Sequence, residues 1–378
     1  MSVVQRFSIS FGCDPELFLE KDGKIIGSER VLPEAGLTSS NCAKPDIVLD
    51  GVQVELNPPP DACRANLGNY LQNAFIALDR HLKAAGAKAT FSGVVQVDRA
   101  ELDALSEKSR ILGCAPSDNL YGTTAININP KTFNTRSAGG HIHIGLNRTS
   151  PWWALKKVDP RRLVALLDVL VGNTCVLIDR DPLAAERRKV YGRAGEYRLP
   201  PHGVEYRTLS NFWLRSYQLF SLVTGLTRLA VCIIGVTESA SSFYLPSATN
   251  KWDAEKDLLK RLDLSAVRRA INTNDLSLAK TNFEAVKAFM REHTLPEDCG
   301  LCSKYLDNFD YFTSMIEQHG IEFWFPDDPL RHWCNKAEGH GTGWEAFIVA
   351  GVNKRRDLEA AKLKVQELTQ AAATMKAA

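Results

Sequence analysis

Apolar and polar residues alternate with a period of two along several short stretches of the chain. The stretch 138–145 reads Ala-Gly-Gly-His-Ile-His-Ile-Gly. On a β-strand, successive side chains point to opposite faces. We therefore expect His141 and His143 to share one face, and Ile142 and Ile144 to share the other. Two imidazoles side by side, next to glycine backbone, indicate a metal or anion site, although two histidines on a solvated sheet face are the simpler interpretation of this stretch alone.

Three further stretches repeat this design with charged and polar side chains. Together they favour a metal or anion site over a solvated sheet face. In each of them polar residues stand two apart, with bulkier or apolar residues between them. The polar positions are Asp14 and Glu16 in the stretch 12–19, Gln53 and Glu55 in 51–57, and Glu205 and Arg207 in 203–208. Four strands with the same pattern predict one antiparallel sheet that has a polar face and an apolar face.

Turn and helix signals divide the rest of the chain. Asp-Gly pairs at 22–23 and 50–51 predict hairpins, and Pro15 predicts a bulge or an edge position because it cannot donate to a sheet ladder. Apolar residues at helical spacing predict helices over 61–85 and 161–180. The apolar run 219–236 contains a threonine pair and an arginine, which favours a buried helix over a membrane span. Residues 28–45 and 113–121 are expected to be loops.

Strand hairpins followed by helices are typical of an α+β fold, here an antiparallel sheet packed on helices. We expect a catalytic core over residues 1–240 and a mainly helical C-terminal region over 241–378, which packs on the core as one unit. A chain of 378 residues is long enough for one large domain or two.

Composition excludes some classes of function. Hydrophobic residues make up 44% and charged residues 24% of the chain, and the net charge is only +2, so no global charge points to nucleic acid or to an anionic membrane. Nine cysteines without a regular spacing favour reduced thiols, and the first residues resemble a strand rather than a signal peptide. We therefore expect a cytoplasmic protein.

The polar face predicts a particular chemistry. Several carboxylates in one cleft repel one another unless cations lie between them, and oxygen-rich ligands with one or two imidazoles suit Mg²⁺ or Mn²⁺. Arg193, Arg198 and Arg207 follow in the segment 186–208 and supply guanidinium groups for phosphate oxygens. Carboxylates, a divalent metal and arginines together indicate phosphoryl transfer.

The ordered blocks carry a resemblance to a known superfamily. Asp-x-Glu, Gln-Val-Glu-Leu-Asn-Pro, Gly-Gly-His-Ile-His and Gly-Val-Glu-Tyr-Arg, spread over residues 8–215, resemble the glutamine synthetase-like carboxylate–amine ligases. Within this superfamily, the chain is most similar to the phage-encoded carboxylate–amine ligase type 2 family. A phage-encoded protein would act in the host cytoplasm. The resemblance implies a funnel-shaped antiparallel sheet, ATP as cosubstrate, and amide formation through an acyl phosphate.

Residue roles follow from the resemblance by position. It implies metal binding by Asp14, Glu16, Glu55, His141 and Glu205, with His143 nearer the nucleotide. It also implies that Arg198 and Arg207 contact phosphate, and that they act together with Arg193 in catalysis. The first strand departs from its relatives, which usually have glutamate where this chain has Asp14. The shorter side chain puts the number of metal ions in doubt.

Two alternatives stay open at this stage. One is another metal-dependent phosphotransferase of the guanidino-kinase type, and the other is an idle binding or structural protein of the same fold. The expected partners are small-molecule or peptide carboxylates and amines, with no nucleic acid and no membrane, and the resemblance allows a homo-oligomer. Cys299, Cys302, His332 and Cys334 have the ligand types of a zinc site but lack its regular spacing.

Overall fold

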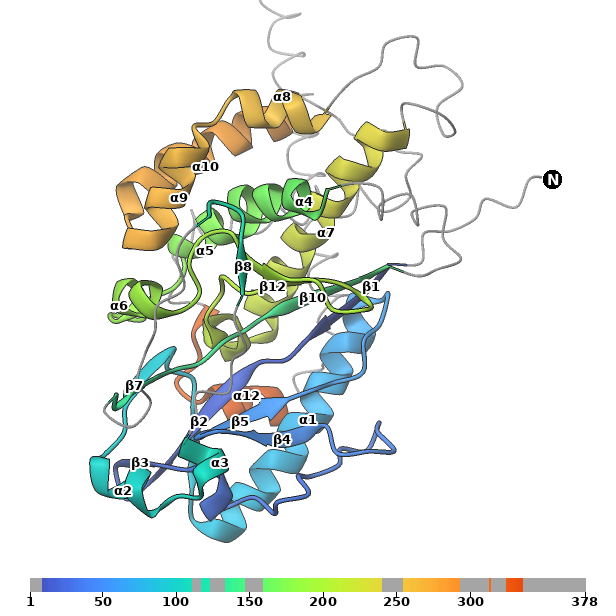
Figure 1. The fold of residues 1–378 in the computed structure, drawn as a ribbon. Helices are drawn as coiled ribbons and strands as arrows, with labels where there is room; N and C mark the ends of the chain where they lie inside the picture. The colour runs from blue at the N-terminus through green and yellow to red at the C-terminus, as the bar shows by residue number, and fades with distance from the viewer. Residues whose placement is uncertain are drawn as a thin grey trace, which may run out of the picture.

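The computed structural model describes residues 9–110, 117–122, 133–146, 159–239, 254–292, 313 and 324–335. Among these residues the fold is α+β, as the sequence predicts, and the paired strands run antiparallel. Figure 1 shows the sheets in the middle and lower part of the molecule and a group of helices above them.

One five-stranded sheet contains β10 (Ile142–Leu146), which carries His143, follows His141 directly and is called the histidine strand below. Its order is β1-β10-β12-β11-β8. The strands are β1 (Ile9–Cys13), β8 (Asp118–Asn119), β10 (Ile142–Leu146), β11 (Glu196–Arg198) and β12 (Gly203–Tyr206).

A second sheet has the order β3-β2-β5-β4, and β6 also pairs with β2. Its strands are β2 (Glu16–Lys21), β3 (Lys24–Ile26), β4 (Ile47–Asp50), β5 (Gln53–Leu56) and β6 (Lys88–Thr90), and β7 (Val94–Gln96) pairs with β9 (Thr135–Ser137) separately. The β2–β3 hairpin turns at Asp22 and Gly23, whose φ angles of 52° and 73° suit a type I′ turn. The β4–β5 hairpin turns after Asp50, which pairs with Gln53, and Gly51 in this turn has a φ angle of 59°, so both predicted hairpins are confirmed.

The expectation of a single sheet is wrong. The chain leaves the first sheet after Cys13 and enters the second sheet at Glu16, with Asp14 and Pro15 between them. Pro15 cannot donate to a ladder, but its carbonyl oxygen accepts from the amide of Leu56 at 2.9 Å. The four predicted strands consequently divide between two sheets: β1, β10 and β12 lie in one, and β2 and β5 in the other.

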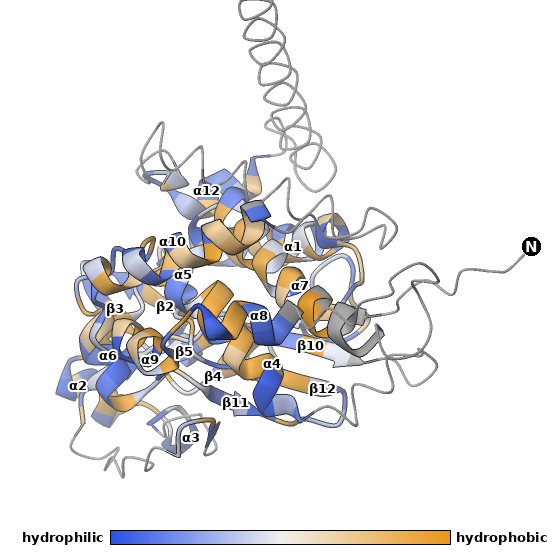
Figure 2. Ribbon diagram, turned by 90° about the horizontal axis from the view of Figure 1, so that it is seen from above, coloured by the Kyte–Doolittle hydropathy of each residue, from blue (hydrophilic) through white to orange (hydrophobic). Residues whose placement is uncertain are grey.

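Helices cover the sheets and form the core. The predicted helices at 61–85 and 161–180 correspond to α1 and to α4, η3 and α5 in succession, where η3 is a π-helical segment. α7 covers the run 219–236, its described side chains are almost all buried, and Figure 2 shows the described part of this helix as mostly hydrophobic. The helices of this part are η1 (Ser28–Arg30), α1 (Arg64–Ala85), α2 (Arg99–Ala104), α3 (Glu107–Arg110), α4 (Pro160–Leu167), η3 (Asp168–Gly172), α5 (Asn173–Val176), α6 (Ala184–Val190), η4 (Asn211–Arg215) and α7 (Tyr217–Ser239).

The described part of the C-terminal region is helical, as expected. It comprises α8 (Ala254–Lys260), α9 (Leu264–Thr273), α10 (Leu276–Glu292) and α12 (Pro329–Cys334). α8 contacts α7, α10 contacts α5, and α12 contacts α1. These helices share the main hydrophobic core with the sheets. The proposed division at residue 240 stays a prediction.

Trp333 joins α12 to the core and gives a prediction of stability. Its ring is fully buried against Phe75, Tyr217 and Phe220, and its indole N–H donates to the carbonyl oxygen of Leu214 at 2.6 Å. Trp333→Ala is expected to lower the free energy of unfolding by about 3–5 kcal/mol, because it removes a large ring and leaves a cavity. Urea denaturation with an unchanged m value would measure this; a loss below about 1 kcal/mol would mean that α12 is not part of the core.

Within the described residues, we find no helix with the length and apolar character that a membrane crossing requires.

Candidate active site

Asp14 lies where the two sheets meet, and its carboxylate contacts both histidines. Oδ1 is 3.0 Å from Nδ1 of His141, and Oδ2 is 3.1 Å from Nε2 of His143. The strand register explains this, because His143 pairs with Gly12 on one side and with Glu205 on the other. The two imidazoles thus share one face, as the alternation predicts.

A first group of ligand atoms is formed by Asp14, His143 and Glu205, whose ligand atoms all lie within 4.8 Å of one another. His141 is close to the same carboxylates, because its Nδ1 also lies 3.7 Å from Oε1 of Glu205. His141 is almost completely buried, and its Nε2 hydrogen-bonds the hydroxyl of Tyr191. Either histidine could therefore complete this group, because a ring nitrogen of each lies about equally near the Asp14 carboxylate, at 3.0 Å for His141 and 3.1 Å for His143.

A second group consists of three carboxylates, Glu16, Asp50 and Glu55, again with ligand atoms within 4.8 Å of one another. Glu16 and Glu55 are direct partners across β2 and β5. Glu16 is only 1% exposed, and its Oε2 accepts from the amide of Gly139 at 2.7 Å and from Nε2 of Gln53 at 3.0 Å. Those bonds fix one carboxylate oxygen against the turn that leads into the histidine strand.

The acidic groups differ in how their pKa values shift. Burial, followed by the nearby charge of Asp50, raises the pKa of Glu16 to about 8. Burial and the charge of Asp14 raise the pKa of Glu55 to about 7. Burial would also raise the pKa of Asp14, but the two imidazoles, His141 first, outweigh it and hold that pKa well below its usual range. Carboxylates that repel one another in this way are stabilised by a bound cation.

The donor atoms fit divalent cations. Oδ1 of Asp14, Nδ1 of His141 and Nε2 of His143 are buried, yet none of them makes a hydrogen bond of good geometry, although they face one another closely. A group of three carboxylates suits Mg²⁺ or Mn²⁺, and a group of two carboxylates and an imidazole suits Mn²⁺ as well as Mg²⁺. The residues present therefore match the metal chemistry that the sequence predicts.

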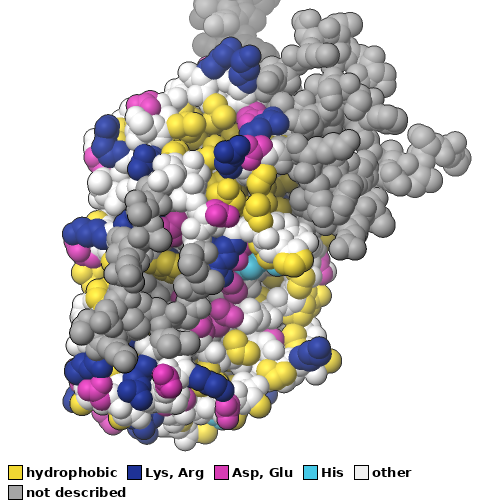
Figure 3. Space-filling model, viewed as in Figure 1, with side chains coloured by type: hydrophobic (Ala, Val, Ile, Leu, Met, Phe, Trp, Pro, Cys, Tyr) yellow, Lys and Arg dark blue, Asp and Glu magenta, His cyan; other side chains and the backbone are white. Residues whose placement is uncertain are grey.

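Two of the three predicted arginines reach this cluster. Arg207 is buried; its Nη1 contacts Oε1 of Glu205, and its Nη2 donates to the hydroxyl of Tyr191 at 3.1 Å. Nη1 of Arg198 lies 3.8 Å from the same Glu205 oxygen. Arg193 points elsewhere, because it donates to the carbonyl oxygens of Arg188 and Lys189 at the end of α6. Figure 3 shows basic, acidic and histidine side chains adjoining one another near the middle of one face.

One arginine that sequence reasoning did not select, Arg187, holds the segments around the site together. Arg187 is fully buried and donates to the carbonyl oxygens of Ala138, Thr208 and Leu209 at 2.8–3.1 Å. It thereby ties the segment before β10 to the segment after β12. The basic sequence of α6 resembles a phosphate-binding loop, but this arginine satisfies backbone carbonyls.

Asp50, Tyr191 and His202 are further residues at the site that sequence reasoning missed. The sequence predicts Asp50 only as a turn residue before Gly51, whereas in the structure it is the direct cross-strand partner of Gln53. Tyr191 stands at the end of α6 and His202 in the turn before β12. No period-two pattern includes either residue, so only the three-dimensional fold reveals them.

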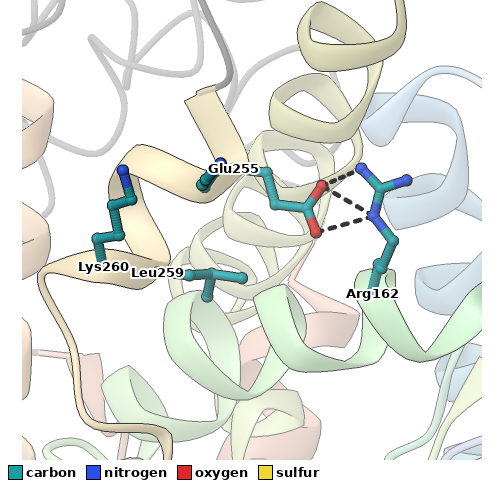
Figure 4. A pocket seen from close by; sticks show the side chains of 5 residues that line it. Arg162, Glu255, Leu259 and Lys260 are labelled. Atoms are coloured by element: carbon teal, nitrogen blue, oxygen red, sulfur yellow. Dashed lines mark hydrogen bonds and ion pairs between the residues drawn. The ribbon is translucent and has the colours of Figure 1, made fainter.

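Two other features lie away from the site. An open hollow of about 520 Å³ between α4 and α8 is lined by Arg162, Glu255, Lys256, Leu259 and Lys260, none of which belongs to the cluster (Figure 4). Within this hollow, Nε of Arg162 donates to Glu255 at 3.0 Å.

The four residues considered as zinc ligands are only partly described. Cys299 and Cys302 lie outside the described residues, and His332 and Cys334 lie on α12.

Comparison with known proteins supports the resemblance. Residues 124–298 match the family model described as "Phage phiEco32-like COOH.NH2 ligase-type 2", so the resemblance predicted from sequence is confirmed over that segment. The matched segment contains the histidine strand and β12 but not β1, β2 or β5. No curated protein sequence matches the chain.

One solved structure gives a distant likeness. A bifunctional glutathione synthetase from Pasteurella multocida aligns with a TM-score of 0.33 and 11% identity, over 90% of this chain and 52% of that one. The present chain thus spans about half the length of that protein. A likeness of this size carries no argument about fold or function.

Proposed function

We propose that this chain, with its match to a COOH.NH2 ligase family, is an ATP-dependent carboxylate–amine ligase that uses Mg²⁺ or Mn²⁺. The single observation that carries the proposal is the convergence of two ligand groups and two arginines at the junction of the two sheets. Such an arrangement suits a reaction in which negative charge accumulates on phosphoryl oxygens. We further propose that the two sheets together form the glutamine synthetase-like funnel.

In this proposal each of the two ligand groups binds one cation. Asp14, Glu205 and a histidine would hold one cation, and Glu16, Asp50 and Glu55 would hold another. When bound, these cations neutralise phosphate oxygens and make the γ-phosphoryl group more electrophilic. The bonds from Gly139 and Gln53 keep Glu16 in place before any ligand arrives, which lowers the cost of organising the site.

The reaction balances as two displacements. An oxygen of the acid's carboxylate attacks the γ-phosphorus of ATP, and ADP leaves. The amine nitrogen then attacks the acyl carbon, phosphate leaves with the oxygen it gained from the acid, and the amine loses a proton. Arg198 and Arg207 would orient phosphoryl or carboxylate oxygens through paired N–H groups. ATP is a cytoplasmic reactant, so we place the reaction in the cytoplasm.

Product analysis tests the proposal. The purified chain is incubated with ATP, Mg²⁺ or Mn²⁺, and a pooled set of amino acids and polyamines, and both released phosphate and product masses are measured. We expect phosphate together with a new mass equal to acid plus amine minus water. A stable phosphorylated product would indicate a kinase instead. Absence of any ATP effect on turnover or thermal stability would favour a binding protein.

A further inference from the structure

His202 stands beside the first ligand group in a turn whose shape is fixed. The turn joins β11 to β12 and contains Pro200 and Pro201, and the amide of Gly203 donates to the carbonyl oxygen of Pro200 at 3.0 Å. A Cβ at Gly203 would lie 2.0 Å from the carbonyl oxygen of Ile144, so only glycine allows this close approach of the turn to β10. The side chain of His202 is thereby held above the histidine strand.

The two imidazoles of His202 and His143 are hydrogen-bonded. Nε2 of His202 lies 3.0 Å from Nδ1 of His143, and the ring centroids are 5.2 Å apart with a tilt of 38°. The opposite nitrogen of His143, Nε2, is buried 3.1 Å from Asp14 and makes no hydrogen bond of good geometry. His143 therefore has one nitrogen directed at a second imidazole and the other directed at the ligand group.

Tautomer chemistry connects these two contacts. A neutral imidazole carries one hydrogen, and only the nitrogen without that hydrogen can bind a metal ion. A hydrogen bond between two imidazole nitrogens needs a hydrogen on one of them. If that hydrogen is on Nδ1 of His143, then Nε2 presents its lone pair to the group that contains Asp14 and Glu205. A partner that accepts from Nδ1 thus favours the metal-binding form.

We propose that His202 is a positioning residue which accepts a hydrogen bond from Nδ1 of His143 and so makes Nε2 of His143 a metal ligand. This inference rests on the metal site of the proposed function. Outer partners of this kind fix both the ring orientation and the tautomer of a ligating histidine, and their loss commonly weakens metal binding 10–100-fold. A neutral imidazole does this without adding a carboxylate to a site that already contains several.

The binding of Mn²⁺ to the full chain tests the inference without any activity assay. Free Mn²⁺ is measured by its electron paramagnetic resonance signal during a titration of wild type, His202→Leu and His202→Gln. Leucine removes the acceptor, so we expect the dissociation constant of one bound ion to rise about 10–100-fold. Glutamine offers an oxygen acceptor near the position of Nε2 and is expected to restore most of the affinity. His81→Gln, which removes an imidazole on α1 that contacts the carbonyl of Val31, is the matched control and should bind like wild type.

A second readout reports the tautomer itself. With ¹⁵N-histidine and saturating Mg²⁺, we expect a protonated, pyrrole-type Nδ1 at His143 in wild type and in His202→Gln. An unprotonated Nδ1 in wild type would overturn the inference. So would equal Mn²⁺ affinity in wild type and His202→Leu, and in that case the metal site and the proposed function would remain. Wild type that binds no Mn²⁺ at all would contradict both.

Discussion

Glu205→Gln is expected to lower the rate of ATP-dependent amide formation by roughly 10³-fold, which corresponds to about 4 kcal/mol of lost transition-state stabilisation. Glu205 is 4% exposed, and its carboxylate lies between the arginines and the histidines of the first ligand group. Glutamine preserves the size of the side chain but removes the charge that a divalent cation needs. Steady-state kinetics at saturating ATP, together with a Mn²⁺ titration, measure both consequences.

The control for this substitution is Glu186→Gln on α6. Glu186 is exposed and pairs with Lys189 at 2.5 Å on the surface, so loss of its charge should leave the rate unchanged. Glu205→Gln also leaves the buried guanidinium of Arg207 without its charged partner, which reduces stability. Glu205→Asp keeps that charge and separates the two effects, because a folded aspartate variant with low activity points to metal geometry. Full activity in a folded Glu205→Gln variant would remove Glu205 from the site.

Arg207→Lys is expected to reduce the turnover number by about 10²–10³-fold, although the net charge is unchanged. The guanidinium of Arg207 contacts Glu205 with one nitrogen, donates to the Tyr191 hydroxyl with the other, and lies 5.6 Å from the centre of the tyrosine ring. A lysine ammonium is a compact charge and cannot make the same planar set of contacts. Measuring the turnover number and the KM for ATP separately shows whether the loss lies in chemistry or in binding.

Arg161→Lys provides the comparison for this change. Arg161 is exposed beside its partner Asp159 at the start of α4, and its exchange for lysine should leave the rate and the KM unaltered. Near-normal activity of Arg207→Lys would place Arg207 outside the phosphate-binding part of the site. Equal losses in both variants would show that the effect is not specific to the cluster.

Alternation along the chain was sufficient to predict the local structure around the site. The period of two correctly placed His141 and His143 on one face, and the Asp-Gly pairs marked both hairpins. These features depend on neighbours within a few residues, so sequence carries them directly. The partners of each strand did not follow from the pattern, because alternation does not specify which strands are neighbours; the pairing of Glu16 with Glu55 across β2 and β5 is a finding of the structure.

Long-range features could not be read in this way. The transfer of the chain from one sheet to the other at Pro15 depends on hydrogen bonds with Gly139 and Leu56, far away in sequence. Asp50 belongs to the second ligand group only because the tip of its hairpin lies against Glu16. In the sequence, Arg187 and Arg193 cannot be distinguished from phosphate-binding arginines. In the structure, both donate hydrogen bonds to backbone carbonyl oxygens. The roles of the site residues stay predictions that the variants above address.

Transfer of an oxygen isotope tests the central claim most directly. The acid identified by product analysis is labelled with ¹⁸O in its carboxylate and supplied with ATP, Mg²⁺ and the amine, and the released phosphate is examined by mass spectrometry. Activation through an acyl phosphate predicts one ¹⁸O atom in each phosphate formed, in step with amide formation. Unlabelled phosphate alongside the amide product would contradict this mechanism, because the carboxylate would then have been activated in some other way.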